Sequence, residues 1–165
     1  MRIQGFLLSA GRMTSRRHLY RFREHWDLDA SPDAVYAALE AVDDYPSWWP
    51  QLSFARIDRH SGTLGIRSFL RYELRLAARE RRRDPGARVL EVAVDGDLAG
   101  WIRWTVLPHG PGARARFEQE VELRNPRMRR WALVGRPVFR ASHDWVLCRG
   151  RRGLRRRLAG PAAGI

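Results

Sequence analysis

Apolar and polar residues alternate along most of this chain, a pattern typical of strands that bury one face. Such stretches begin near residue 17 and again near residue 52, and the last one spans residues 113–123. The stretch over residues 66–82 is so long that it predicts a bent strand or a bulge. Asp95-Gly96 predicts a tight hairpin turn between the stretches on either side of it. We expect an antiparallel meander of six to seven strands.

Two segments have helical spacing instead. Ser31-Pro32 predicts the start of a short helix, because serine caps helices and proline suits the first helical position. This helix leads into a tight aromatic connection over residues 45–50. Asn125-Pro126 predicts a second start, and its apolar stripe continues to about Leu158. Pro137 should kink or restart that long helix.

This order of elements predicts an α+β fold with one domain. The apolar face of a curved sheet and the apolar stripe of a long helix must bury each other. A sheet that curls around one helix leaves space between the two, and this space is the natural ligand cavity. We assign residues 16–160 to the domain, residues 1–15 to a tail expected to be disordered, and residues 161–165 to a second tail.

Composition narrows the class of protein. The 165 residues carry a formal net charge of +13, and all 31 basic residues are arginine. Either GC-rich coding or selection for anionic partners would produce this bias. No apolar run is long enough for a membrane span, and the patch at residues 6–8 is too short for a secretory signal. The single cysteine, Cys148, excludes an internal disulfide, so we expect a cytoplasmic protein.

Four segments, taken in order, resemble the START-like (SRPBCC) superfamily and, within it, the polyketide cyclase/dehydrase branch. They are the strand-to-helix entry Trp26–Tyr36, the aromatic segment Tyr45–Pro50, the hairpin Gly96–Gly100 and the helical stretch Arg136–Val146. The resemblance covers about residues 17–160. It implies a helix-grip fold, in which a curved antiparallel sheet of six to seven strands wraps around a long C-terminal helix, with one or two short helices after the first strand.

The resemblance also implies a hydrophobic cavity for a polyketide-, lipid- or isoprenoid-like ligand. It implies no cofactor, because the superfamily has no obligatory metal or nucleotide. It does not decide whether the protein is an enzyme, since the superfamily mixes aromatase/cyclases with lipid and hormone binders.

A cyclase in such a cavity needs a base that removes an α-proton and a donor that helps a hydroxyl group leave. The catalytic candidates are the polar residues Glu24, Tyr72 and His143, because each falls on an otherwise apolar face or helix stripe. Each has a structural alternative. Glu24 is either a buried acid with a raised pKa or a surface carboxylate paired with an arginine. His143 is either catalytic or hydrogen-bonded to the sheet, where it would hold the helix in place.

The residues expected to contact a ligand are mostly aromatic, and about half of the aromatic side chains should only fill the core. We expect Trp48 and Trp49 at the cavity mouth and Gly150 where the helix approaches the sheet. The ligand-binding candidates are Trp26, Trp48, Trp49, Tyr72, Trp104, Phe117, Gln119, Phe139, Ser142 and Val146.

Three functions are compatible with the sequence. The first is a polyketide cyclase/dehydrase-like enzyme, and the second is a carrier that binds a lipid or quinone without catalysis. The third is a basic protein that binds nucleic acid or an anionic surface, although no specific nucleic-acid motif is present. Arginines over residues 149–157 either complement the helix dipole or face an anionic membrane. Arg127, Arg129 and Arg130 would instead fix an acidic substrate or an acyl-carrier protein. The histidines lack the spacing of a metal site.

Overall fold

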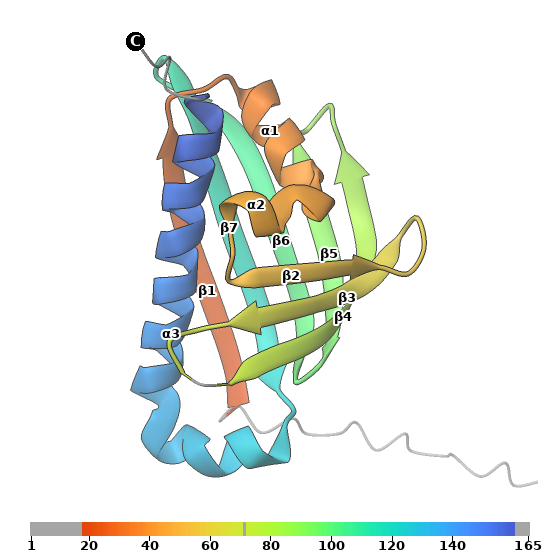
Figure 1. Ribbon diagram of the computed structural model, residues 1–165, viewed down its shortest axis with the longest axis vertical. Helices are drawn as coiled ribbons and strands as arrows, with labels where there is room; N and C mark the ends of the chain where they lie inside the picture. The colour runs from red at the N-terminus through yellow and green to blue at the C-terminus, as the bar shows by residue number, and fades with distance from the viewer. Residues whose placement is uncertain (1–17, 71, 161–165) are drawn as a thin grey trace, which may run out of the picture.

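A seven-stranded antiparallel sheet curves around one long helix, as the ribbon shows (Figure 1). The structure, a computed structural model, describes residues 18–70 and 72–160. The strand order is β1-β7-β6-β5-β4-β3-β2, which leaves β1 and β2 at the two edges. The strands are β1 (Leu19–Leu28), β2 (Leu52–Arg56), β3 (Ser61–Arg67), β4 (Glu73–Asp84), β5 (Val89–Gly96), β6 (Leu98–His109) and β7 (Gly112–Leu123).

The helices lie on the concave side of the sheet and complete the helix-grip fold (Figure 1). They are α1 (Pro32–Glu40), the 3-10 turn η2 (Val42–Asp44), α2 (Tyr45–Trp48) and α3 (Pro126–Leu158). The predicted fold class is therefore confirmed. The tails predicted at residues 1–15 and 161–165 lie outside the described residues.

Strand β1 shows how the alternating pattern builds the two faces of the sheet. Tyr20 and Trp26 are fully buried on the inner face. Outward side chains pair with β7, as where Arg21 Nε lies 2.7 Å from Glu120 Oε2. Arg103 on β6 likewise lies 2.6 Å from Glu91 on β5. Many arginines of the outer face are thus neutralised locally by glutamates of neighbouring strands.

The region after α2 differs from the sequence prediction. Residues 66–82 do not form one bent strand, because the chain turns between Arg67 and Glu73 and these two residues pair across β3 and β4. A bulge does occur, but between Glu80 and Arg82. The prediction was wrong because the alternation of apolar and polar residues continues through the turn. Successive residues keep their inner and outer positions while the chain reverses direction.

Helix α3 begins as predicted, with the Asn125 side chain accepting a hydrogen bond from the Arg127 amide at 3.0 Å. The helix continues through Pro137 to Leu158 rather than restarting. It bends in its first half (Figure 1), as expected where proline removes a backbone hydrogen bond. The bend directs the second half of α3 along β1.

Helix α2 docks directly onto the second half of α3. A Cβ atom at Gly150 would overlap the Trp49 ring, and one at Gly153 would overlap the Trp48 carbonyl oxygen. The Trp49 indole N–H also donates to the Val146 carbonyl at 2.9 Å. The prediction that Gly150 faces the sheet is therefore wrong, since its close neighbour is α2. These contacts set the distance between α2 and α3.

Candidate ligand-binding cavity

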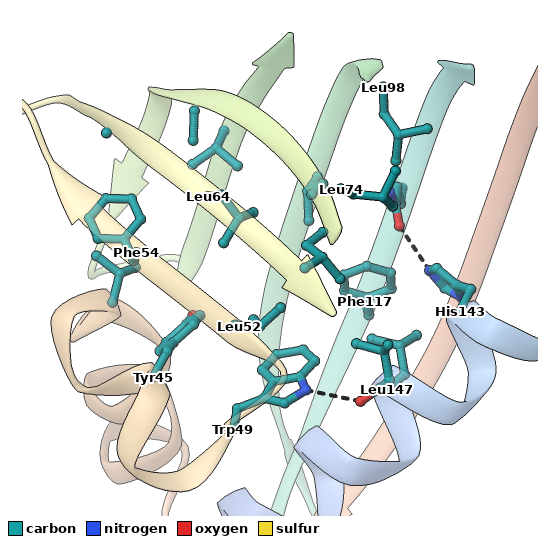
Figure 2. Close-up of a pocket in the computed structure, with 18 of the residues that line it drawn as sticks. Tyr45, Trp49, Leu52, Phe54, Leu64, Leu74, Leu98, Phe117, His143 and Leu147 are labelled. Atoms are coloured by element: carbon teal, nitrogen blue, oxygen red, sulfur yellow. Dashed lines mark hydrogen bonds between the residues drawn. The ribbon is translucent and has the colours of Figure 1, made fainter. Parts of the chain in front are cut away.

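A cavity of about 590 Å³ lies between the inner face of the sheet, α2 and α3 (Figure 2). Its wall is mainly apolar, with leucine, isoleucine and aromatic side chains from every layer. The principal apolar contributors are Tyr45, Trp49, Leu52, Phe54, Leu64, Ile66, Leu74, Leu90, Val92, Leu98, Ile102, Trp104, Phe117, Phe139, Val146 and Leu147. This volume lies within the range typical of small-molecule sites.

A hydrogen-bonded pair, Gln119 and His143, interrupts the apolar wall (Figure 2). Gln119 is 6% exposed, and its Oε1 lies 2.9 Å from His143 Nε2. Because an amide oxygen only accepts, this contact places the imidazole proton on Nε2. The Gln119 amide nitrogen makes no hydrogen bond to another described residue. It is available to donate to an oxygen atom of a bound molecule.

His143 is held in a neutral state. Its ring stacks on Phe22 with centroids 3.5 Å apart, and its side chain is only 14% exposed. Burial lowers the pKa of His143 to about 4, against the opposing effect of the Asp144 carboxylate, while the Arg140 guanidinium lowers this pKa further. His143 Nδ1 is buried and has no hydrogen-bond partner among the described residues. The imidazole is therefore uncharged near neutral pH.

Tyr72 lies at one end of the cavity, where its hydroxyl is already engaged. Asn125 Nδ2 donates to this hydroxyl at 2.6 Å, and Asp97 Oδ2 lies 3.4 Å from it. Burial raises the pKa of Tyr72, with the Asp97 charge adding to the effect. Tyr72 thus stays protonated and joins the start of β4 to the start of α3.

Glu24 follows the predicted alternation of β1 but does not reach the cavity. Its carboxylate accepts a hydrogen bond from Trp26 Nε1 at 3.2 Å, and Glu24 is not among the residues that line the cavity. It is not an acid inside the ligand space, and among the described residues it forms no ion pair with an arginine. Of the three catalytic candidates, the structure brings Tyr72 and His143 to the same cavity and leaves Glu24 outside it.

Most of the predicted ligand contacts line the cavity. They are Trp49, Tyr72, Trp104, Phe117, Gln119, Phe139, Ser142 and Val146. Trp26 and Trp48 do not. Trp26 is fully buried against Trp49 and Trp104, with ring centroids 5.5 and 4.7 Å away.

The predicted mouth at Trp48 and Trp49 needs correction as well, since both are buried, at 5% and 4% exposed. The glycines of α3 let α2 pack so closely that these two side chains face inward. Trp49 consequently forms part of the cavity wall, and Trp48 packs behind it.

A polar cluster at the other end of the cavity was missed by the sequence analysis. Arg83 lies 2.8 Å from Glu80 and 3.2 Å from Glu40, and all three line the cavity. Glu80 continues the inner face of Leu76 and Ala78, and the extra residue of the bulge between Glu80 and Arg82 brings Arg83 to that same face. The sequence signal for a bulge there, an over-long alternating run, did not give its position.

Two further observations concern other site types. The described part of the chain contains no cluster of three His, Cys, Asp or Glu side chains that could hold a metal ion. Within residues 18–70 and 72–160, no helix is both long and apolar enough to cross a membrane.

Comparison with known families identifies the fold family. The profile of the family described as polyketide cyclase/dehydrase and lipid transport matches residues 28–146. The chain belongs to this family. No curated protein matches it closely enough to add a more specific relative.

Solved structures share the fold of this cyclase/dehydrase-family protein at low sequence identity. TTHA0849 from Thermus thermophilus is 16% identical with a TM-score of 0.76, over 87% of this chain and 100% of that one. A START superfamily protein from Mycobacterium smegmatis is 14% identical with a TM-score of 0.68, over 84% and 97%. The ZhuI aromatase/cyclase from Streptomyces sp. R1128 is 13% identical with a TM-score of 0.68, over 90% and 100%. The predicted START-like resemblance is confirmed.

Proposed function

We propose that this protein binds a hydrophobic small molecule, polyketide-, lipid- or isoprenoid-like, that carries at least one carbonyl or hydroxyl oxygen. The observation that carries the proposal is the apolar cavity of about 590 Å³ with the Gln119–His143 pair in its wall. Burial of the apolar body of the ligand supplies affinity. The Gln119 amide N–H supplies orientation, because an unmet donor in an apolar wall favours ligands that accept a hydrogen bond.

The experiment places a phenylalanine side chain in the cavity by substituting one residue of its wall. The same substitution at the neighbouring residue is the control. Ala78 lines the cavity, whereas Ala77 is exposed on the opposite face of β4. We expect Ala78→Phe to lower the affinity for a fluorescent naphthalene probe by at least about tenfold, because the ring occupies ligand space. Ala77→Phe should bind the probe like the unmodified protein. Equal affinity of all three proteins would contradict the proposal.

A second candidate function, cyclisation of a poly-β-ketone, is supported by the neutral His143 in the cavity wall. In this reaction the His143 ring turns so that Nδ1 leaves its buried position and faces the ligand, and Nδ1 takes an α-proton. The resulting enolate carbon bonds to a carbonyl carbon. The carbonyl π electrons move to oxygen, which takes the proton from the imidazolium. Loss of water then forms a double bond. The cavity contributes by holding the substrate chain in the folded conformation that brings the two carbons together.

Catalysis and carriage differ in their response to His143→Gln, which removes the base but keeps an amide beside Gln119. For a cyclase, we expect turnover of a poly-β-ketone substrate to fall by about a hundredfold or more while probe affinity is retained. The kcat/KM of the unmodified protein should stay level from neutral pH down to about pH 5, because the pKa of His143 is about 4. Probe binding without turnover in either protein would assign the non-catalytic carrier function.

We propose a cytoplasmic location, and an acyl-carrier protein or an anionic membrane as the source of the ligand. The net charge of +13 supports an acidic or anionic partner. Nucleic acid is less well supported, because outer-face arginines such as Arg21 and Arg103 are paired with glutamates.

A further inference from the structure

The loop between β3 and β4 lies beside α3 (Figure 1). Exposed apolar side chains gather there, at one end of the cavity. Leu70 and Val138 line the cavity and are 37% and 45% exposed. Phe69, 51% exposed, packs edge-on against Trp145 of α3 with centroids 6.0 Å apart. We call Phe69, Leu70 and Val138 the apolar rim. Because two of its members line the cavity and face solvent, the rim marks an opening of the cavity.

Arginines flank the apolar rim. Arg127 lines the same end of the cavity, and the Arg149 guanidinium lies 5.1 Å from the centre of the Trp145 ring. Arg136 and Arg140 extend from the part of α3 that carries the rim, over aromatic rings of β1.

These four arginines are exposed, and none lies within 4.0 Å of an Asp or Glu carboxylate among the described residues. Asp144, the one acidic residue on this part of α3, lies beside His143 instead. The rim therefore combines apolar side chains with cations that retain their charge.

We propose that the apolar rim and its arginines dock this protein on an anionic membrane surface. A bilayer surface satisfies both kinds of group, since apolar side chains enter the interface while guanidinium groups pair with lipid phosphates. This inference rests on the proposed function, because docking gives an apolar ligand a route between bilayer and cavity that avoids water.

The size of the rim favours a membrane over a protein partner. A stable protein interface buries roughly 800 Å² on each partner and involves about 20 to 30 residues a side. The rim offers three apolar side chains and scattered cations, too few for such an interface. Peripheral membrane proteins, by contrast, bind a bilayer by inserting a few apolar side chains and by electrostatic attraction to anionic lipids.

The test measures co-sedimentation of the full chain with vesicles of phosphatidylcholine alone or of phosphatidylcholine mixed equally with phosphatidylglycerol. We expect binding to the mixed vesicles only, weakened by added NaCl because salt screens the attraction. The double variant Phe69→Ser, Leu70→Ser should reduce the partition coefficient by about tenfold or more. The double variant Arg127→Gln, Arg149→Gln should reduce it by a similar factor.

Leu107→Ser provides the matched control. Leu107 is 40% exposed, close to the value for Leu70, but lies on β6 next to the hairpin at the C-terminal end of α3 (Figure 1). Its replacement should leave vesicle binding unchanged. Equal loss with Leu107→Ser, or no loss with either rim variant, would overturn the assignment of the docking surface to the rim.

Probe binding without vesicles separates this inference from the proposed function. Protein that takes up the naphthalene probe but ignores both kinds of vesicle would overturn docking and leave the cavity function standing. Protein that binds mixed vesicles but no probe would leave docking standing and overturn the cavity function. Rim-dependent binding to a purified acyl-carrier protein, without binding to vesicles, would replace the membrane by an acidic protein partner and so refute the inference.

Discussion

The buried His143 should lower the free energy of unfolding as the pH falls. The substitution His143→Gln should remove this contribution. His143 is enclosed by Phe22, Gln119 and the second half of α3, and the charged groups that face it are Asp144 and Arg140. Burial lowers the pKa of His143 from 6.5 to about 4 in the folded protein. In the unfolded chain the same side chain titrates near its ordinary value.

The sign follows from proton binding. Between about pH 6.5 and about pH 4 the unfolded chain binds a proton at this position and the folded protein does not, so the free energy of unfolding falls as the pH is lowered. Protonation of His143 alone therefore costs about 3 kcal/mol of stability between neutral pH and about pH 4. Above about pH 6.5 the histidine is neutral in both states, and its contribution no longer changes with pH.

The assay is urea unfolding followed by tryptophan fluorescence, for the unmodified protein and for His143→Gln, at several pH values. Glutamine does not titrate, and the carboxylates common to both proteins cancel when their stabilities are subtracted. We expect the difference in unfolding free energy to shift by about 3 kcal/mol, in favour of the variant at low pH. A difference that stays constant across this range would refute the argument that His143 is buried and neutral.

Two other variants test how the helices are held. Gly153→Ala should destabilise the protein by more than about 2 kcal/mol, because the new methyl group overlaps the Trp48 backbone, whereas Gly86→Ala has room and should be nearly neutral in the same thermal unfolding measurement. Tyr45→Phe should cost about 1 to 2 kcal/mol, because the buried Tyr45 hydroxyl donates to the Leu39 carbonyl at 2.6 Å; equal melting temperatures for variant and parent would show that this hydrogen bond does not stabilise the fold.

The sequence predicted the architecture well because strand sidedness and helix capping are local properties. Tyr72 was assigned to the apolar face of the stretch over residues 66–82, and it does line the cavity. The connection was wrong because alternation reports which face a residue occupies and says nothing about where the chain turns. The turn between β3 and β4 passes without a break in the pattern.

The parts of the site that escaped prediction depend on contacts between distant segments. Gln119 and His143 were separate candidates, and their hydrogen bond depends on how α3 lies over β7. Trp49 was expected at the cavity mouth because it lies in the aromatic connection that follows the short helix. Its burial depends on Gly150, about a hundred positions further along the chain, and no local pattern carries that information.

The glycine-mediated seat of α2 on α3 has a consequence for how ligand preference can evolve. Gly150 and Gly153 fix the spacing of the two helices, yet neither belongs to the wall that a bound molecule touches. A bulkier residue at either position would push α2 outward and widen the chamber with every wall residue unchanged. Homologues with the same wall residues would thus bind ligands of different size. A comparison of the wall residues alone would not reveal that the difference comes from positions 150 and 153.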